Sequence, residues 1–163
     1  KKLPAPDLNT LPPALRELGA SFVTLTEGGD LRGCIGTLEA RQALALDVIE
    51  HAAAASQEDF RFRPVMPGEV ARLRIEISRL TPMQRLEYAR PDDLPGLLRP
   101  HVDGVVLRDS YRRATFLPQV WEKLPDPREF LMHLCAKMGA PATLWQRKLL
   151  EVYTYQVEEF QED

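Results

Sequence analysis

The sequence predicts an α+β fold in which an antiparallel β-sheet is flanked by helices. Two pairs of short alternating runs, at residues 21–38 and 104–117, are each joined by a turn signal, as in β-hairpins. Two longer segments, residues 40–56 and 126–138, carry apolar side chains at helical spacing. Antiparallel hairpins combined with two main helices indicate the α+β class.

The length and composition fit one globular domain. The chain has 163 residues, of which 44% are apolar, so it can bury a substantial core. A formal net charge of −3 gives no electrostatic reason to expect nucleic acid or an anionic membrane as a partner. The sequence contains no apolar run near the roughly 18 residues of a membrane span, no visible signal peptide and only two cysteines. We therefore expect a reduced, cytoplasmic protein without a membrane segment.

The N-terminal part of the chain leads into the first hairpin. Residues 1–11 are expected to be extended, and a short helix is expected to open at Pro12-Pro13 and to run through Leu18, with Gly19 at its C′ position. The first hairpin then turns at Gly28-Gly29.

The second strand of this hairpin carries the stretch Leu31-Arg32-Gly33-Cys34-Ile35-Gly36-Thr37. Side chains alternate across a strand, so Arg32 and Cys34 are expected on one face, about 6.6 Å apart. A guanidinium that close would favour the thiolate form of the cysteine. Glycines inside a strand mark a bulge or a close approach, and here they would leave space around the sulfur.

Two interpretations of Cys34 stay open at this point. Cys34 is either a reactive thiol or a small buried hydrophobe, as free cysteines often are, with Arg32 reaching solvent or a carboxylate. A single cysteine without a base beside it in the sequence does not define a reaction. The stretch therefore predicts a special site at the hairpin without naming its chemistry.

The segment 40–56 is predicted to be a helix packed on the sheet, because Leu44, Val48 and Ala52 recur at helical spacing. His51 lies at the edge of that apolar stripe. It is either a partly buried boundary residue or a base for the Cys34 thiol, a role that requires hydrogen-bond distance.

Residues 59–64, Asp-Phe-Arg-Phe-Arg-Pro, alternate aromatic rings with arginines. This pattern can form a stacking and phosphate-binding surface for nucleic acid. Alternatively, the rings hold the loop against the core and the arginines pair locally, for example with Asp59. We favour the second interpretation because the overall charge is balanced.

Leu73–Leu80 alternates clearly and is predicted to be a strand, with Glu76 and Ser78 on its polar face, either in a pocket or toward solvent. The second hairpin pairs Gly104–Leu107 with Arg112–Leu117. Arg112 and the next residue, Arg113, point to opposite faces, so one of them is expected to enter a polar interior or pocket.

The C-terminal part is predicted to hold a helix that Asp126-Pro127 caps, with Cys135 on its apolar face, and one last strand near residues 150–160. Trp121, before this helix, is predicted to be a core or boundary anchor. The His and Cys spacing matches no zinc pattern, and no phosphate-binding or dinucleotide-binding fingerprint is present. We therefore expect neither a metal nor a cofactor.

Five segments of the sequence resemble segments of one known family in their order and spacing. These segments are Phe22-Val23-Thr24-Leu25, Leu31 to Thr37, Asp59 to Pro64, Ile77 to Thr81, and Thr115-Phe116-Leu117-Pro118-Gln119-Val120-Trp121. They are similar to the AMMECR-domain family, whose bacterial and archaeal members are called AmmeMemoRadiSam system protein A. Phe60 and Ala114 depart from its pattern, since Pro and Gly are common at those positions.

The resemblance implies an α+β body with a smaller subdomain and a cleft between them. It covers the chain as a single domain over residues 1–163, in which residues 1–19 form a leading segment and residues from about 20 to 163 match the family. It points to Arg32, Gly33, Cys34 and Gly36 as the site. By name and gene context it implies a Memo-like protein and a radical-SAM protein as partners, and it implies no particular reaction.

Two functions are therefore open. In the first, the chain is an enzyme or an enzyme subunit in which Cys34 is a nucleophile or covalent carrier, and Arg32 lowers its pKa or holds an anionic substrate. In the second, the hairpin is the docking surface or ligand pocket of a binding or adaptor module that acts with the Memo-like and radical-SAM partners. Either function leaves room for an unidentified small-molecule ligand. The further residues expected at the site are Gly33, Gly36, Thr37, Asp59, Arg61, Ser78, Arg112, Arg113 and Thr115.

Overall fold

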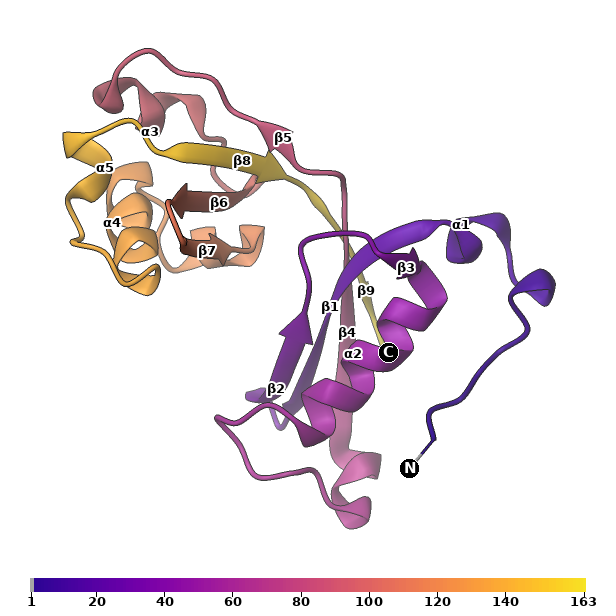
Figure 1. The fold of residues 1–163 in the computed structure, drawn as a ribbon. Coiled ribbons are helices and arrows are strands. Elements are labelled where there is room, and N and C mark those ends of the chain that lie inside the picture. Colours follow the sequence, from indigo (N-terminus) through magenta and orange to yellow (C-terminus); the bar gives the residue numbers. More distant parts are fainter. Residues whose placement is uncertain (1) are drawn as a thin grey trace. The chain divides into compact units, whose positions relative to one another are not determined.

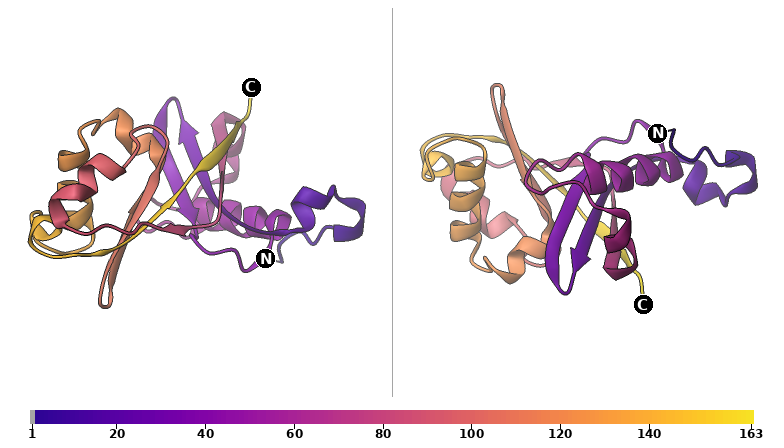
Figure 2. Two further views of the ribbon diagram at one scale, coloured as in Figure 1. Left: turned by 90° about the horizontal axis from the view of Figure 1, so that it is seen from above. Right: turned by 90° about the horizontal axis from the view of Figure 1, so that it is seen from below.

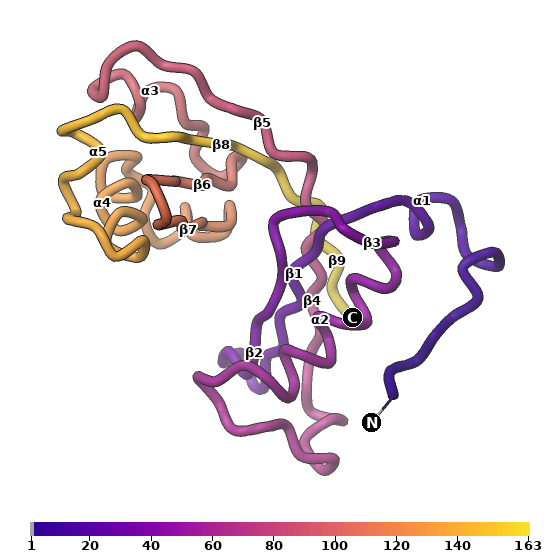
Figure 3. The backbone as a smooth tube through the Cα atoms, in the orientation of Figure 1, coloured from indigo at the N-terminus to yellow at the C-terminus, as the bar shows by residue number. Residues whose placement is uncertain are grey.

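The computed structural model describes residues 2–163 and has an α+β architecture of antiparallel strand pairs and helices, which confirms the predicted fold class (Figure 1). The chain divides into two compact units. Unit 1 comprises Lys1–Pro82 and Glu158–Asp163, and unit 2 comprises Met83–Val157. Unit 2 is thus inserted into the sequence of unit 1, and the trace in Figure 3 passes into it once and returns once.

Unit 1 contains a sheet with the strand order β2-β1-β4-β9, in which the short β3 also pairs with β1. Its elements are η1 (Leu8–Thr10), α1 (Pro13–Arg16), β1 (Leu18–Glu27), β2 (Asp30–Gly36), β3 (Gln42–Ala43), α2 (Leu44–Gln57), η2 (Pro67–Arg72), β4 (Leu73–Leu80) and β9 (Val157–Gln161). The helix α2 covers one face of the sheet and runs beside β1 and β2 (Figures 1 and 2).

The β1–β2 hairpin forms because its glycine turn and the alternating pattern of its strands favour the same structure. Gly28 and Gly29 take positive φ angles of 60° and 86°, which a two-residue turn between twisted strands requires and which glycine adopts without a steric penalty. Along β1, every second residue faces α2, so Val23 and Leu25 are buried against Ala55. The core of unit 1 is therefore the layer between the sheet and α2.

Unit 2 contains a second sheet, with the strand order β5-β8-β6-β7. Its elements are β5 (Gln84–Arg85), η3 (Pro91–Asp93), α3 (Leu94–Leu97), β6 (Gly104–Asp109), β7 (Arg112–Phe116), η4 (Pro118–Glu122), α4 (Pro127–Lys137), α5 (Leu144–Arg147) and β8 (Glu151–Tyr155). Trp121 and Cys135 are fully buried in its core, as predicted. Trp121 stacks on Phe130 with the ring centroids 3.7 Å apart and donates its Nε1–H to the carbonyl of Asp103.

Two predicted element boundaries are wrong. The first helix ends at Arg16 and not at Leu18, because β3 pairs with Leu18 and Gly19, which therefore belong to β1. The single strand predicted over residues 150–160 is two strands: β8 belongs to the sheet of unit 2 and β9 to that of unit 1. The break falls at Gln156, whose side chain donates to Asp103. Within residues 2–163, no helix is both long and apolar enough to span a bilayer.

Candidate functional site

Cys34 lies in the middle of β2, on the sheet face that points away from α2. It pairs with Thr24 of β1, whose neighbours Val23 and Leu25 face the helix. Alternation therefore places the side chains of Thr24 and Cys34 on the opposite face, where the Cys34 Sγ lies 3.2 Å from the Thr24 hydroxyl oxygen. The Cys34 residue is partly exposed, whereas Cys135 is fully buried, and both are free thiols.

The backbone of Cys34 is held from outside the sheet by an ion pair. The Asp59 carboxylate accepts the backbone N–H of Cys34 at 2.9 Å, and the Arg61 guanidinium donates to the Cys34 carbonyl at 3.4 Å. The Arg61 guanidinium also donates twice to Asp59, at 2.9 and 2.7 Å, which confirms the predicted local pairing. Because β2 is the edge strand, these side chains bind the N–H and C=O groups that no further strand would bind.

The charges of Asp59 and Arg61 stabilise each other. Asp59 is buried, with a side chain 3% exposed, and the Arg61 guanidinium holds its pKa far below the usual range. The hydrogen bond from Cys34 lowers the pKa of Asp59 further. Conversely, Asp59 raises the pKa of Arg61, and the negative charge of a Cys34 thiolate adds to that rise. Arg61 is therefore a cation whose charge interacts favourably with the thiolate form of Cys34.

Arg32 pairs with a carboxylate, which is one of the environments that the sequence left open for it. The register of β1 and β2 shifts between Leu25 and Thr26, which leaves Arg32 as the extra residue of a β-bulge. Its guanidinium donates to both carboxylate oxygens of Glu69, at 3.1 and 3.3 Å. It also donates to the carbonyl oxygens of Arg63, at 2.9 Å, and Pro64, at 3.4 Å. Arg32 thus fastens the loop before η2 to the hairpin.

The glycines of the stretch allow close contacts within the chain itself. A Cβ on Gly33 would lie 2.2 Å from the carbonyl oxygen of Ala55, so the absence of a side chain lets α2 approach the strand. A Cβ on Gly36 would lie 2.4 Å from the ring of Phe22 and from the carbonyl oxygen of Ser21. Both glycines are therefore explained by packing inside unit 1.

The remaining predicted site residues fall into separate places. In unit 1, Ser78 is buried on β4 opposite Phe22, and Thr37 is exposed just after β2, with its N–H donating to Ser21 at 3.2 Å. The other residues, Arg112, Arg113 and Thr115, belong to β7 in unit 2.

Within unit 2, these three residues have distinct surroundings. Arg112 donates to Asp109 at 2.8 Å and to the carbonyl of Gly139 at 3.1 Å, whereas Arg113 is exposed. The Thr115 hydroxyl lies 2.8 Å from the Tyr155 hydroxyl and donates to the carbonyl of Val105. Burial raises the pKa of Tyr155 to about 12, so its hydroxyl stays protonated and keeps these hydrogen bonds at neutral pH.

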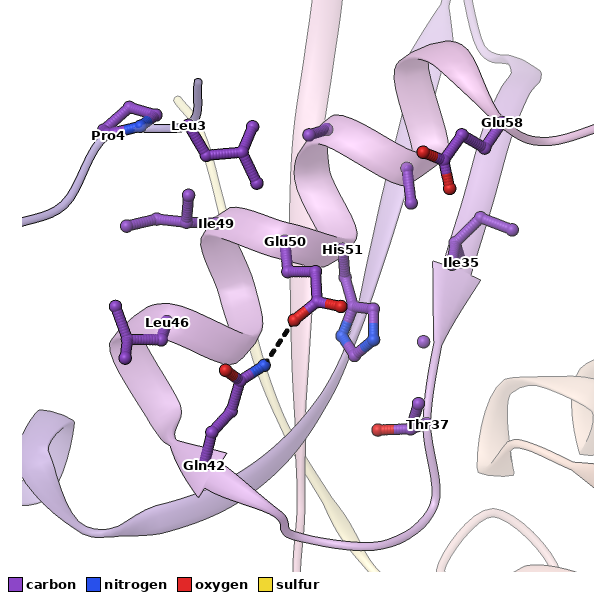
Figure 4. A pocket seen from close by; sticks show the side chains of 13 residues that line it. Leu3, Pro4, Ile35, Thr37, Gln42, Leu46, Ile49, Glu50, His51 and Glu58 are labelled. Carbon is purple, nitrogen blue, oxygen red and sulfur yellow. Dashed lines mark hydrogen bonds between the residues drawn. The ribbon is translucent and has the colours of Figure 1, made fainter. Parts of the chain in front are cut away.

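A pocket that the sequence did not predict lies beside α2 in unit 1 (Figure 4). His51 lines it, and so do Gly36 and Thr37 from the end of β2. Because α2 covers the face opposite Cys34, His51 is not placed to act as a base for the thiol. Across residues 2–163, no group of three or more His, Cys, Asp or Glu side chains could hold a metal ion.

Comparison with known proteins decides the family. Residues 1–160, nearly the whole chain, match the AMMECR1 family. The chain belongs to the AMMECR1 family. The family resemblance stated from the sequence is thereby confirmed.

AMMECR1 relatives occur among archaeal proteins. A protein of Methanothermobacter thermautotrophicus is 40% identical over 164 residues, which cover 100% of this chain and 84% of the relative. A protein of Thermofilum pendens is 36% identical over 166 residues, covering 93% of this chain and 76% of the relative. The crystal structure of the uncharacterized protein PH0010 from Pyrococcus horikoshii is similar with a TM-score of 0.91 at 32% identity, covering 100% of this chain and 82% of that one.

Proposed function

We propose that the chain is an enzyme, or a subunit of one, in which Cys34 acts as a nucleophile or covalent carrier. The observation that carries this proposal is the contact of Asp59 with the backbone N–H of Cys34 and of Arg61 with its carbonyl. The contact fixes the strand at Cys34, while the side chain itself points away from the core and stays partly exposed. A nucleophile needs both a fixed position and access to its substrate.

Arg61 takes the electrostatic role in this proposal that the sequence pattern gave to Arg32. The thiolate is the reactive form of cysteine, and a nearby guanidinium stabilises it. The side chain of Arg61 is 49% exposed, so it can also contact an anionic group of a substrate bound at Cys34. Thr24, at 3.2 Å from the sulfur, supplies a hydroxyl that can donate to the thiolate.

The test is the pH dependence of iodoacetamide labelling, read by mass spectrometry. We expect Cys34 to label in the folded protein and Cys135 only after unfolding, because Cys135 is fully buried and burial raises its pKa. Replacing Arg61 by Met should slow the labelling of Cys34, because the variant loses the cation whose charge interacts favourably with the thiolate. The matched control is Arg63→Met, since Arg63 is also exposed and makes its ion pair with Glu69 at 3.8 Å. Labelling of Cys34 only on unfolding would contradict the proposal.

A second candidate function is that of an adaptor for the Memo-like and radical-SAM proteins that the family resemblance implies. Phe60 supports it, because this ring is 96% exposed on the same loop as Asp59 and Arg61. Large aromatic side chains at such positions are typical of protein contacts. We expect Phe60→Ala to weaken co-purification with a co-expressed Memo-like or radical-SAM protein. Tyr111→Ala is the control, because Tyr111 is 93% exposed at the tip of the β6–β7 hairpin. Equal recovery with both variants would count against the adaptor function.

A further inference from the structure

The sheet of unit 2 carries the hydrophobic core on one face and a row of charged side chains on the other. Leu107 of β6 and Val152 of β8 are buried in the core, so Arg108 and Glu151, each one position away, point to the opposite face. Arg113 of β7 pairs with Arg108 and therefore lies on that face as well. The row belongs to unit 2 alone and does not depend on the function proposed above.

The members of this row lie directly opposite one another on adjacent strands. Arg108 pairs with Glu151 on one side and with Arg113 on the other. Adjacent strands are about 4.8 Å apart, so the two guanidinium groups are close neighbours. Like charges at directly opposed positions destabilise a sheet, and both arginines are exposed. An anion from outside the chain that lies between them would remove this repulsion.

Glu151 does not neutralise the whole row, because a third arginine shares its charge. Arg85 of β5 lies 3.5 Å from the Glu151 carboxylate, which also accepts the Tyr153 hydroxyl. This hydrogen bond and the charges of Arg108 and Arg85 lower the pKa of Glu151, so it is an anion at neutral pH. Glu87 lies 3.7 Å from Arg85, at the edge of the sheet farthest from β7. The positive charge on this face is therefore concentrated on β6 and β7.

The charge pattern favours a short acidic peptide segment over a nucleic acid. Guanidinium groups bind carboxylates and phosphates alike through paired N–H donors. A nucleic acid carries a phosphate on every nucleotide, so beside the arginines it would also meet Glu151, and the whole chain has a net charge of −3. A peptide can place a carboxylate at the arginines and an uncharged side chain opposite Glu151. Because β7 is an edge strand, an extended segment can approach this end of the sheet.

We infer that this face of unit 2 docks an extended acidic segment of a partner protein. One carboxylate of the segment lies over Arg108 and Arg113 and accepts hydrogen bonds from both guanidinium groups. It thereby removes the repulsion between the two arginines, and the segment keeps a neutral side chain opposite Glu151. Arginine is enriched in protein interfaces for this kind of contact.

The test measures the binding of fluorescein-labelled probes to the full chain by fluorescence anisotropy. The probes are a short peptide that alternates Glu with Val, the same peptide with Gln in place of Glu, and an oligothymidylate of equal length. We expect the Glu peptide to bind about ten-fold more tightly than either of the others, the size of a hydrogen bond to a charged group. Its affinity should fall as salt is added. Equal binding of the Gln peptide or of the oligothymidylate, or no binding of the Glu peptide, would overturn the inference.

Variants locate the binding on this face. Arg108→Gln and Arg113→Gln should each weaken binding of the Glu peptide about three- to five-fold, as for a partly solvated charge pair. Both side chains are exposed, so both variants should fold. Arg90→Gln is the matched control, since Arg90 also belongs to unit 2, has a side chain 80% exposed and precedes η3, outside the sheet.

Glu151→Gln reverses the sign of the expected effect. This variant removes the carboxylate of the row and keeps an acceptor for the Tyr153 hydroxyl, so the Glu peptide should bind more tightly. Unchanged affinity in both Arg108→Gln and Arg113→Gln, or an equal loss in Arg90→Gln, would overturn the assignment to this face. Weaker binding to Glu151→Gln would contradict the acidic character of the segment.

Discussion

The Asp59 carboxylate accepts a hydrogen bond from the backbone N–H of Cys34 across 2.9 Å. This bond joins the loop after α2 to the edge strand at the one cysteine of the hairpin. Asp59 also accepts two hydrogen bonds from the Arg61 guanidinium, so this one carboxylate contacts both the edge strand and the side chain of Arg61. The position of the thiol therefore depends on a residue 25 positions away in the sequence.

Asp59→Asn should remove the ion pair and weaken the bond to Cys34. We expect a loss of about 2 kcal/mol in the free energy of unfolding at neutral pH, as for hydrogen bonds to a charged group. The pKa of Asp59 is lower in the folded than in the unfolded state, so its contribution is complete above the unfolded value of about 3.9 and is lost as pH falls below it. The difference in the free energy of unfolding between wild type and variant, measured by urea unfolding, should be constant near neutral pH and should become smaller in acid. A difference independent of pH down to acid would contradict this account.

Arg32→Met should loosen the loop and leave the thiol unaffected. The variant loses the hydrogen bonds to Glu69 and to the carbonyls of Arg63 and Pro64, and the pKa of Glu69 should rise, since Arg32 is the main cause of its low value. We expect faster amide hydrogen exchange over residues 63–69 and an unchanged rate of Cys34 labelling. A labelling change as large as that of Arg61→Met would restore the role that the sequence pattern suggested for Arg32.

Gly33→Ala should destabilise unit 1, because the new methyl group would meet the carbonyl of Ala55 at 2.2 Å and push α2 off the strand. We expect a loss of about 3 kcal/mol in the free energy of unfolding, at the upper end for overpacking. Gly68→Ala is the matched control, since nothing lies within 4 Å of a Cβ at that position and its φ needs no glycine. Similar unfolding midpoints in urea for the two variants would show that α2 accommodates the methyl group.

Tyr155→Phe should lower the free energy of unfolding by about 1 kcal/mol near neutral pH, because the hydrogen bonds to Thr115 and the Phe116 carbonyl are lost. Burial raises the pKa of Tyr155 to about 12, against about 10 for a phenol in the unfolded chain. A raised pKa gives stability that is complete below the unfolded value and is lost as pH rises through the folded one. The advantage of wild type should therefore shrink between about pH 10 and 12. Thermal unfolding of both proteins across this range measures it, and a constant difference would argue against a buried, protonated phenol.

Local sequence patterns were sufficient to predict most of the helices and strands. The predicted strand at Leu73–Leu80 coincides with β4, because its alternation spans the full length of the element. The capped helix after Asp126 is present as α4, and Asp126 accepts the backbone N–H of Arg128 as an N-cap should. In such segments the turn, cap and periodicity signals all lie within a few neighbouring residues.

The surroundings of the candidate site could not be predicted in the same way. The partner of Arg32 is Glu69, which is 37 positions away, and a β-bulge at Arg32 leaves no mark in an alternating pattern. The pairing of Arg61 with Asp59 was accessible, since the two residues are close in sequence. The contact of His51 with Asp47 had one available signal, the helical i, i+4 spacing, but Ser21 joins these two residues from a different element.

The insertion of unit 2 into unit 1 sets the order in which a ribosome delivers the parts of one sheet. β4 has β1 on one side and β9 on the other, and β9 is synthesised only after the whole of Met83–Val157. During that interval the nascent sheet ends in β4 as an open edge, which is a template for pairing with other chains. Premature termination within unit 2 should therefore release an aggregation-prone fragment, whereas synthesis through β9 closes the edge with the chain's own backbone.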